Sequence, residues 1–284
     1  MASTPLDLLF TLNASYIQPL QVALYSIRVN HPQQAIRIWL VHESLSPEEI
    51  RSLEEVCQLL DFSFHPIQVD GSRWQSAKTA KRYPKEMYFR LLAGEILPTT
   101  LDRVLYLDPD ILVINSLLDL WQLDLKDHVF AAASHTGLTD ASTRINQLRL
   151  DMDHAYFNSG VLLINLTQAR LKIHWADIQD TLDKYNNFLL LPDQDVLNYL
   201  YGKYTLEIPE EIWNYDARKY LRYLARSMNR HDIHWVLDHT SVLHFCGQPK
   251  PWQEEHDNRF TGLYLDYQKR IDQLLKNNTK KQFN

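Results

Sequence analysis

The chain has 284 residues, 45% of them hydrophobic and 23% charged, which is ordinary for a globular protein that buries a sizeable core. Its formal net charge of -6 argues against a general nucleic-acid binder, which carries a basic patch or stripe. The two cysteines, Cys57 and Cys246, lie in unrelated contexts and suggest neither a zinc site nor a disulfide framework. These features favour a reducing compartment.

The N-terminus lacks the pattern of a signal peptide, and no apolar run reaches the ~18 to 20 residues of a membrane span. We therefore expect a soluble, cytoplasmic protein, and surface contact with the inner face of a membrane is compatible with this expectation. Residues 1–275 are predicted to form one domain with two halves, 1–115 and 116–275. The polar, basic segment 276–284 is expected to be a frayed tail.

Strand and helix signals alternate along the first half. A capping box at Ser46 and Glu49, with proline at the first helical position, opens one helix. Short apolar runs have the length of buried strands at 6–12, 36–41, 62–69 and 103–107. Helical signals lie at 19–27, 46–60 and 86–95. The alternation predicts an α/β fold with parallel strands, joined by right-handed crossovers, and ligands at their carboxyl ends.

The pattern is less regular in the second half and weakens after Trp213. Val196 to Leu200 is expected to continue a helix from Asp195. A tyrosine stripe at 220, 223, 264 and 267 is more typical of a core than of a ligand cleft. Further apolar runs suggest strands at 129–133, 160–166 and 242–245.

An acidic pair, Asp108 and Asp110, follows the predicted strand 103–107. Side chains at i and i+2 of an extended backbone point the same way, so both carboxylates can face one hard cation such as Mg²⁺ or Mn²⁺. Pro109 helps to end the ladder because it lacks a donor. Two other interpretations stay open at this point: a polar turn with capping aspartates, and a phosphatase of the haloacid-dehalogenase type with Asp108 as nucleophile.

A second group lies in the segment Val242 to Trp252, which reads VLHFCGQPKPW. An apolar strand delivers His244, Gly247 permits a tight loop, and two prolines flank Lys250. Imidazole is a good third ligand for Mn²⁺, and the ammonium suits a phosphate. Taken alone, His244 fits a core histidine and Lys250 a solvated lysine; their combination is more specific.

A third group of candidates comes from two segments. Asn158 lies shortly before Gly160, which leads into a predicted buried strand, and the run Pro192-Asp193-Gln194-Asp195 lies at the start of a predicted helix. Acidic residues in a first helical turn are also explained by ordinary capping. In this order the motifs resemble glycosyltransferase family 8, which includes bacterial lipopolysaccharide galactosyl- and glucosyltransferases and glycogenin. The matching runs span most of the chain: LYLDPD at 105–110, FNSGVLLINL at 157–166, DQD at 193–195, and 244–252.

The resemblance implies a GT-A type fold, Rossmann-like with a mainly parallel sheet flanked by helices. It also implies retention of anomeric configuration, a UDP-glucose or UDP-galactose donor, and Mn²⁺ (or Mg²⁺) as cofactor. By resemblance Asp108, Asp110 and His244 hold the metal, and Gln194 and Asp193 lie at the reacting carbon, with Asp195 as a further candidate. The implied donor-binding residues are Thr11, Asn13, Tyr16, Arg90, Asn158, Gly247 and Lys250.

Two positions depart from the family pattern. Asn13 replaces the aspartate that commonly accepts a hydrogen bond from uracil, although an amide oxygen can accept the same bond. Ser134-His135-Thr136-Gly137 lies where an aspartate often contacts the sugar, which leaves glucose or galactose open.

The sequence thus predicts a hexosyltransferase of polysaccharide biosynthesis acting on a glycan, a lipid-linked sugar or a protein. A phosphatase or nucleotide-sugar hydrolase and a non-catalytic sugar-nucleotide-binding protein are the alternatives. The sequence carries no signal for the oligomeric state.

Overall fold

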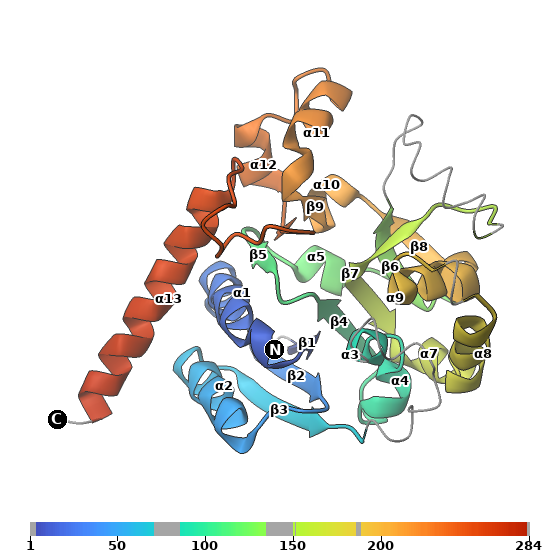
Figure 1. Cartoon of the computed structure of the whole chain (residues 1–284), viewed down its shortest axis with the longest axis horizontal. Helices are drawn as coiled ribbons and strands as arrows, with labels where there is room; N and C mark the ends of the chain where they lie inside the picture. Colours follow the sequence, from blue (N-terminus) through green and yellow to red (C-terminus); the bar gives the residue numbers. More distant parts are fainter. Residues whose placement is uncertain (1–3, 71–85, 135–149, 151, 186–188, 283–284) are drawn as a thin grey trace.

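The computed structural model describes residues 4–70, 86–134, 150, 152–185 and 189–282 (Figure 1). A seven-stranded sheet has the strand order β3-β2-β1-β4-β7-β6-β8, and a small sheet has the order β5-β10-β9. The strands of the large sheet are β1 Leu6–Thr11, β2 Ile36–His42, β3 Ser63–Gln68, β4 Arg103–Leu107, β6 Phe130–Ser134, β7 Phe157–Asn165 and β8 Thr205–Ile208. Those of the small sheet are β5 Ile111–Val113, β9 Tyr215–Asp216 and β10 Val242–His244.

Helices flank the large sheet. The α-helices are α1 Ile17–Asn30, α2 Pro47–Leu59, α3 Glu86–Phe89, α4 Ala93–Ile96, α5 Leu118–Trp121, α7 Leu166–Lys172, α8 Trp175–Tyr185, α9 Pro192–Val196, α10 Glu210–Trp213, α11 Tyr220–Arg226, α12 Ile233–His239 and α13 Thr261–Gln282. A π-helical turn, η4 Leu197–Tyr201, continues α9. Within the described ranges the short 3-10 helices are η1 Ala14–Tyr16, η5 Gly202–Tyr204 and η6 Ala217–Lys219. Among the described residues no helix is both long and apolar enough to cross a membrane.

The large sheet is mainly parallel. Strands β1, β2, β3 and β4 pair in parallel, as do β6 and β8, whereas β7 runs antiparallel to both β4 and β6. The expected parallel pairing therefore holds for the N-terminal strands but not for β7. Successive strands are added outward from β1 to β3, and β4 then pairs with the other side of β1. The carboxyl ends of β1 and β4 thus form the reversal point at which α/β sheets bind ligands.

Strands β1 and β4 are largely apolar because the sheet is covered on both faces there, whereas the edge strand β3 is partly exposed. On β1, Leu8 and Phe10 face the core that contains α1 and α2, whereas Leu9 faces the opposite core. A strand buried on both sides reads as a continuous apolar run, and each fully buried leucine contributes about 1.5–3 kcal/mol. This burial holds the ends of β1 and β4 in fixed positions.

A third, smaller core surrounds the small sheet. Tyr220, Tyr223 and Tyr264 are buried there, and Tyr267 is half-buried against them. The tyrosine stripe is therefore core, as its spacing predicted. This cluster joins β9 and β10 to α11 and α13 and so fixes the end of β10.

Two predicted segments differ from the structure. The expected helix 86–95 is two short helices, α3 and α4, separated by a turn in which the amide of Leu91 bonds to Tyr88. The turn directs Arg90 inward. The expected frayed tail 276–284 is wrong as far as Gln282, because α13 continues to that residue without a glycine or proline to stop it. The end of α13 projects away from the sheet (Figure 1). The predicted capping box at Ser46 is present.

Candidate active site

The two aspartates lie where β4 leaves the large sheet. The backbone amide of Asp108 still donates to the carbonyl of Gly160 on β7, at 2.8 Å, after which Pro109 ends the ladder. The chain then enters β5 directly after Asp110. Both carboxylates therefore lie at the carboxyl end of a central strand, as the sequence predicted.

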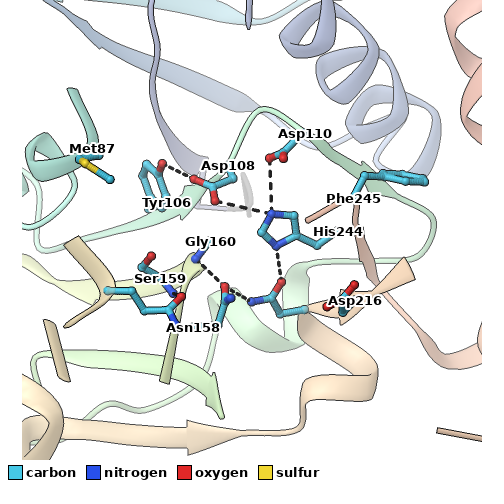
Figure 2. Close-up of polar contacts among 12 residues, drawn as sticks. Met87, Tyr106, Asp108, Asp110, Asn158, Ser159, Gly160, Asp216, His244 and Phe245 are labelled. Carbon is cyan, nitrogen blue, oxygen red and sulfur yellow. Dashed lines mark hydrogen bonds and ion pairs between the residues drawn. The ribbon is translucent and has the colours of Figure 1, made fainter. Parts of the chain in front are cut away.

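His244 reaches the aspartates because β10 pairs antiparallel with β5, which places His244 opposite Ile111. Its Nε2 atom lies 3.6 Å from Asp108 Oδ2 and 3.4 Å from Asp110 Oδ1 (Figure 2). One ligand atom from each of the three residues lies within 4.8 Å of the others. Two carboxylate oxygens and an imidazole nitrogen form a set that fits a divalent cation such as Mn²⁺.

Gly160 leaves the space that this convergence needs. A Cβ atom at this position would lie 2.3 Å from His244 Cε1 and 2.7 Å from Asp108 Oδ2. Any larger residue would therefore displace the imidazole or the carboxylate. The glycine of the Asn158-Ser159-Gly160 run is required by close approach, not by backbone conformation.

Arg90 neutralises the opposite side of the acidic pair. Its Nη1 atom lies 2.9 Å from Asp108 Oδ1 and 3.6 Å from Asp193 Oδ2, and it donates to the carbonyl of Ser159 at 3.0 Å. Burial by itself would lower the pKa of Arg90, but the carboxylates, Asp108 first, raise it above its ordinary value. The guanidinium therefore stays charged. Tyr106 donates to the same Asp108 oxygen at 2.5 Å and lies beneath the guanidinium.

Lys250 and Gly247 belong to the segment after β10. The Lys250 ammonium is buried, contacts Asp110 Oδ2 and donates to the carbonyl of Phe245 at 2.9 Å. Burial alone would raise the pKa of Asp110, but His244 and Lys250 hold it below its ordinary range. Gly247 has a φ of +72° and lies against Arg218. The ring of Trp252 packs edge-on against Tyr16, with centroids 6.1 Å apart, so the late segment contacts the first loop.

A cavity of about 220 Å³ opens beside the aspartates. It brings together residues from the first loop, the turn after α3 and the end of β4. Its lining consists of Thr11, Leu12, Asn13, Tyr16, Met87, Arg90, Asp108, Pro109 and Asp110. Six of these were candidates from the sequence; Leu12, Met87 and Pro109 were not. The oxygen of Asn13 accepts from Ser15, at 3.1 Å from its backbone nitrogen and 2.6 Å from its hydroxyl.

Asp193 and Gln194 lie in the first turn of α9, on the far side of Arg90. Asp193 Oδ2 accepts from the Ser159 hydroxyl at 3.0 Å, and burial raises the pKa of this carboxyl. Gln194 Oε1 accepts from the backbone nitrogen of Ser159 at 3.3 Å. Both side chains are thus attached to β7 next to Arg90.

Asp195 differs from its two neighbours. It is fully buried, and its oxygens accept from the Tyr156 hydroxyl at 2.6 Å and from the backbone nitrogens of Leu190 and Leu191 at 2.7 and 3.1 Å. These bonds favour the capping interpretation of this acidic residue over contact with a sugar or an acceptor.

The sequence did not indicate Asn214, which lies between α10 and β9. Its amide oxygen lies 2.8 Å from His244 Nδ1, and its amide nitrogen donates to Asn158 Oδ1 at 2.7 Å. No motif marks an isolated asparagine between Trp213 and Tyr215, so only the tertiary structure reveals it.

The second departure from the family pattern was the segment 134–137. Its first residue, Ser134, ends β6 and donates a hydrogen bond to Glu207, and residues 135–137 lie outside the described residues.

The fold and these contacts define an α/β protein whose acidic pair and histidine, at the carboxyl end of a central strand, could hold a metal ion. Residues 7–256 match glycosyl transferase family 8. The match covers most of the chain, which therefore belongs to this family and is a glycosyltransferase with a GT-A type fold. The dehalogenase-type phosphatase considered from the acidic pair belongs to a different family.

Relatives and solved structures agree with this assignment. General stress protein A of Bacillus subtilis is 23% identical over 259 residues, covering 89% of each chain. A lipopolysaccharide 1,2-glucosyltransferase of Escherichia coli is 26% identical over 242 residues, covering 82% of this chain and 69% of its own. The galactosyltransferase LgtC, solved with donor and acceptor sugar analogues, superposes with a TM-score of 0.78 at 26% identity, covering 93% and 96% of the two chains.

Proposed function

We propose that the chain is a retaining hexosyltransferase that transfers glucose or galactose from a UDP-sugar and depends on Mn²⁺, with Mg²⁺ as the alternative ion. The observation that carries the proposal is the convergence of Asp108, Asp110 and His244 at the edge of the cavity. A divalent cation held there would offset the negative charge on a departing nucleoside diphosphate, an effect of several kcal/mol.

The cavity supplies groups for the nucleotide. Tyr16 offers an aromatic face, and Thr11 and Asn13 offer polar atoms beside it. Among the described residues, Arg90 and Lys250 are buried cations in contact with the acidic pair. We assign Lys250, with Gly247 in the same loop, to the diphosphate, because an ammonium near the leaving oxygen stabilises the charge that develops there.

We assign Asp193 and Gln194 to the sugar and the reacting carbon. Their place in α9, across Arg90 from Asp108, supports this assignment. A carboxylate and an amide oxygen can both stabilise positive charge at an anomeric carbon. We assign Asn158, at the start of β7, to the donor by the family resemblance; its amide oxygen accepts from the backbone nitrogen of Gly160 at 2.8 Å.

The acceptor in this proposal is a glycan, a lipid-linked sugar or a protein. Two of the similar proteins, a lipopolysaccharide 1,2-glucosyltransferase and a galactosyltransferase, support a glycan acceptor.

The test is a screen of UDP-glucose, UDP-galactose and a non-uridine sugar nucleotide for release of nucleoside diphosphate, with Mn²⁺ or with a chelator. We expect turnover of a UDP-sugar with Mn²⁺ and none with the chelator. Asp108→Asn removes a charge at constant size and should abolish turnover, whereas Asp153→Asn, in an exposed ion pair with Lys203, should not. Chelator-resistant turnover, or turnover in the Asp108 variant, would reject the proposal.

A further inference from the structure

The two ring nitrogens of His244 face different partners. Nε2 faces Asp108 and Asp110, whereas Nδ1 lies 2.8 Å from Asn214 Oδ1. The amide nitrogen of Asn214 donates to Asn158 Oδ1 at 2.7 Å, and the backbone N–H of Gly160 donates to the same oxygen at 2.8 Å. Three hydrogen bonds, which we call the asparagine relay, therefore connect the backbone of β7 to the imidazole.

The direction of every bond in the asparagine relay follows from its first donor. The backbone nitrogen of Gly160 can only donate, so the Asn158 atom that it contacts is the amide oxygen. That oxygen can only accept, so Asn214 presents its NH2 group to Asn158 and its own oxygen to His244. An amide oxygen only accepts, and His244 Nδ1 must therefore carry a proton. The lone pair of the neutral ring is left on Nε2.

We propose that Asn214 and Asn158 are positioning residues that fix the tautomer and the ring orientation of His244, so that Nε2 is presented as a ligand to the cation site. The inference rests on the proposed metal site. Histidine ligands commonly donate their second N–H to an oxygen, and loss of that partner typically weakens metal binding about 10–100-fold.

The surroundings hold the asparagine relay rigidly. Asn214 and His244 are both buried, and the backbone nitrogen of Asn214 bonds to the carbonyl of Glu210 at 3.0 Å. Strand β9 begins at the next residue and pairs with β10, which carries His244. The backbone of Gly160 serves both sides of the site, because its carbonyl accepts from Asp108 N while its N–H begins the asparagine relay.

The experiment measures binding of Mn²⁺ alone, by electron paramagnetic resonance of the free ion, in the whole chain. We expect Asn214→Leu and Asn158→Leu each to weaken binding about tenfold or more. Asn158→Asp is the matched variant: its carboxylate still accepts from both Gly160 and Asn214, and its added charge favours a cation. It should bind Mn²⁺ no more weakly than the original chain.

The control for loss of a hydrogen-bonded amide is Asn115→Leu. Asn115 bonds to the carbonyls of Leu237 and Thr240 and contacts none of the three proposed ligands, so its loss should leave Mn²⁺ affinity unchanged. Thermal unfolding of every variant shows whether it folds. If Asn214→Leu does not fold, the Asn158→Leu and Asn158→Asp pair still decides the question.

A second measurement reads the tautomer directly. Nitrogen-15 chemical shifts of His244 in the metal-free protein at alkaline pH should show the Nδ1–H form, and Asn214→Leu should show a mixture. Unchanged Mn²⁺ affinity in Asn214→Leu, or Asn158→Asp binding as weakly as Asn158→Leu, would overturn the proposal. Failure of the original chain to bind Mn²⁺, or equal binding by Asp108→Asn, would instead reject the metal site itself.

Discussion

The Lys250 ammonium contacts the carboxylate of Asp110, which we also propose as a metal ligand. A positive charge from the protein thus lies against one oxygen of Asp110. The contact implies competition, because a cation that approaches Asp110 meets Lys250 already in place. When a metal ion shares the Asp110 carboxylate, we expect the Lys250 ammonium to become available to a diphosphate.

Replacement of Lys250 by methionine should therefore affect two ligands in opposite directions. Mn²⁺ alone should bind several times more tightly, because Asp110 is freed and a repelling charge is removed. UDP in saturating Mn²⁺ should bind about tenfold or more weakly, since a charge-assisted hydrogen bond contributes about 1.5–3 kcal/mol. Calorimetric titration measures both. Lys203→Met, at an exposed lysine, is the control, and parallel changes in the two affinities would contradict the competition.

Removal of Arg90 should destabilise the fold through charges that lose their partner. Arg90→Met leaves the carboxylates of Asp108 and Asp193 without their shared cation, and breaking a buried pair costs about 3–5 kcal/mol. Urea unfolding measures the loss. Arg90→Met combined with Asp193→Asn should recover part of the stability, because one of the unpaired charges is gone. A double variant no more stable than Arg90→Met would show that the loss has another cause.

Two glycine-to-alanine changes should distinguish a glycine that leaves space for the proposed metal ligands from one whose side is open. Gly160→Ala should abolish Mn²⁺ binding, because the new methyl group would lie 2.3 Å from the His244 ring. Gly262→Ala, in the first turn of α13, meets nothing within 4 Å and should leave binding intact, with stability unchanged or raised by up to about 1 kcal/mol. Metal titration and thermal unfolding test both, and Mn²⁺ binding by Gly160→Ala would reject the crowding argument.

His31 should make stability depend on pH. Its Nδ1–H donates to the carbonyl of Ile27 at 2.9 Å, and its Nε2 accepts from the backbone nitrogen of Leu117 at 2.8 Å, so the folded protein needs the neutral ring. Burial lowers the pKa of His31 below its ordinary value of about 6.5. The unfolded chain therefore takes up a proton first as the pH falls, and the stability present above about pH 6.5 is lost below it.

The loss should reach at most about 1.4 kcal/mol per pH unit for this single group. His31→Gln should flatten the decline in unfolding free energy between about pH 6.5 and 5, whereas His234→Gln, at an exposed histidine, should not. Urea unfolding at several pH values provides the comparison. Equal slopes for the original chain and His31→Gln would contradict the assignment.

The strands and the acidic pair were predictable because their signals are local. The apolar run of β4 and the i, i+2 spacing of Asp108 and Asp110 are both visible in a few consecutive residues. The sequence around His244 made it a candidate third ligand, and the family resemblance assigned it to the metal. Its approach to the aspartates depends on β10 pairing with β5 across a long stretch of chain. No local pattern could place that imidazole beside the aspartates.

Other features depend on tertiary contacts alone. Arg90 was expected within one helix, but the chain turns at this point and sends the guanidinium to Asp108 and Ser159. Asn214 gave no signal, because its function depends on two neighbours brought together by different strands. The extended α13 was missed because a polar segment without glycine or proline is equally compatible with a helix and with a tail.

The pairing of β5 with β10 has a mechanical consequence. It is the contact that joins aspartates from the first half of the molecule to a histidine near its C-terminal end. An ion bound by all three side chains would hold β5 and β10 together and would bind the folded state more tightly than the unfolded state. The melting temperature should then rise with Mn²⁺ concentration, because a ligand that binds only the native state shifts the unfolding equilibrium.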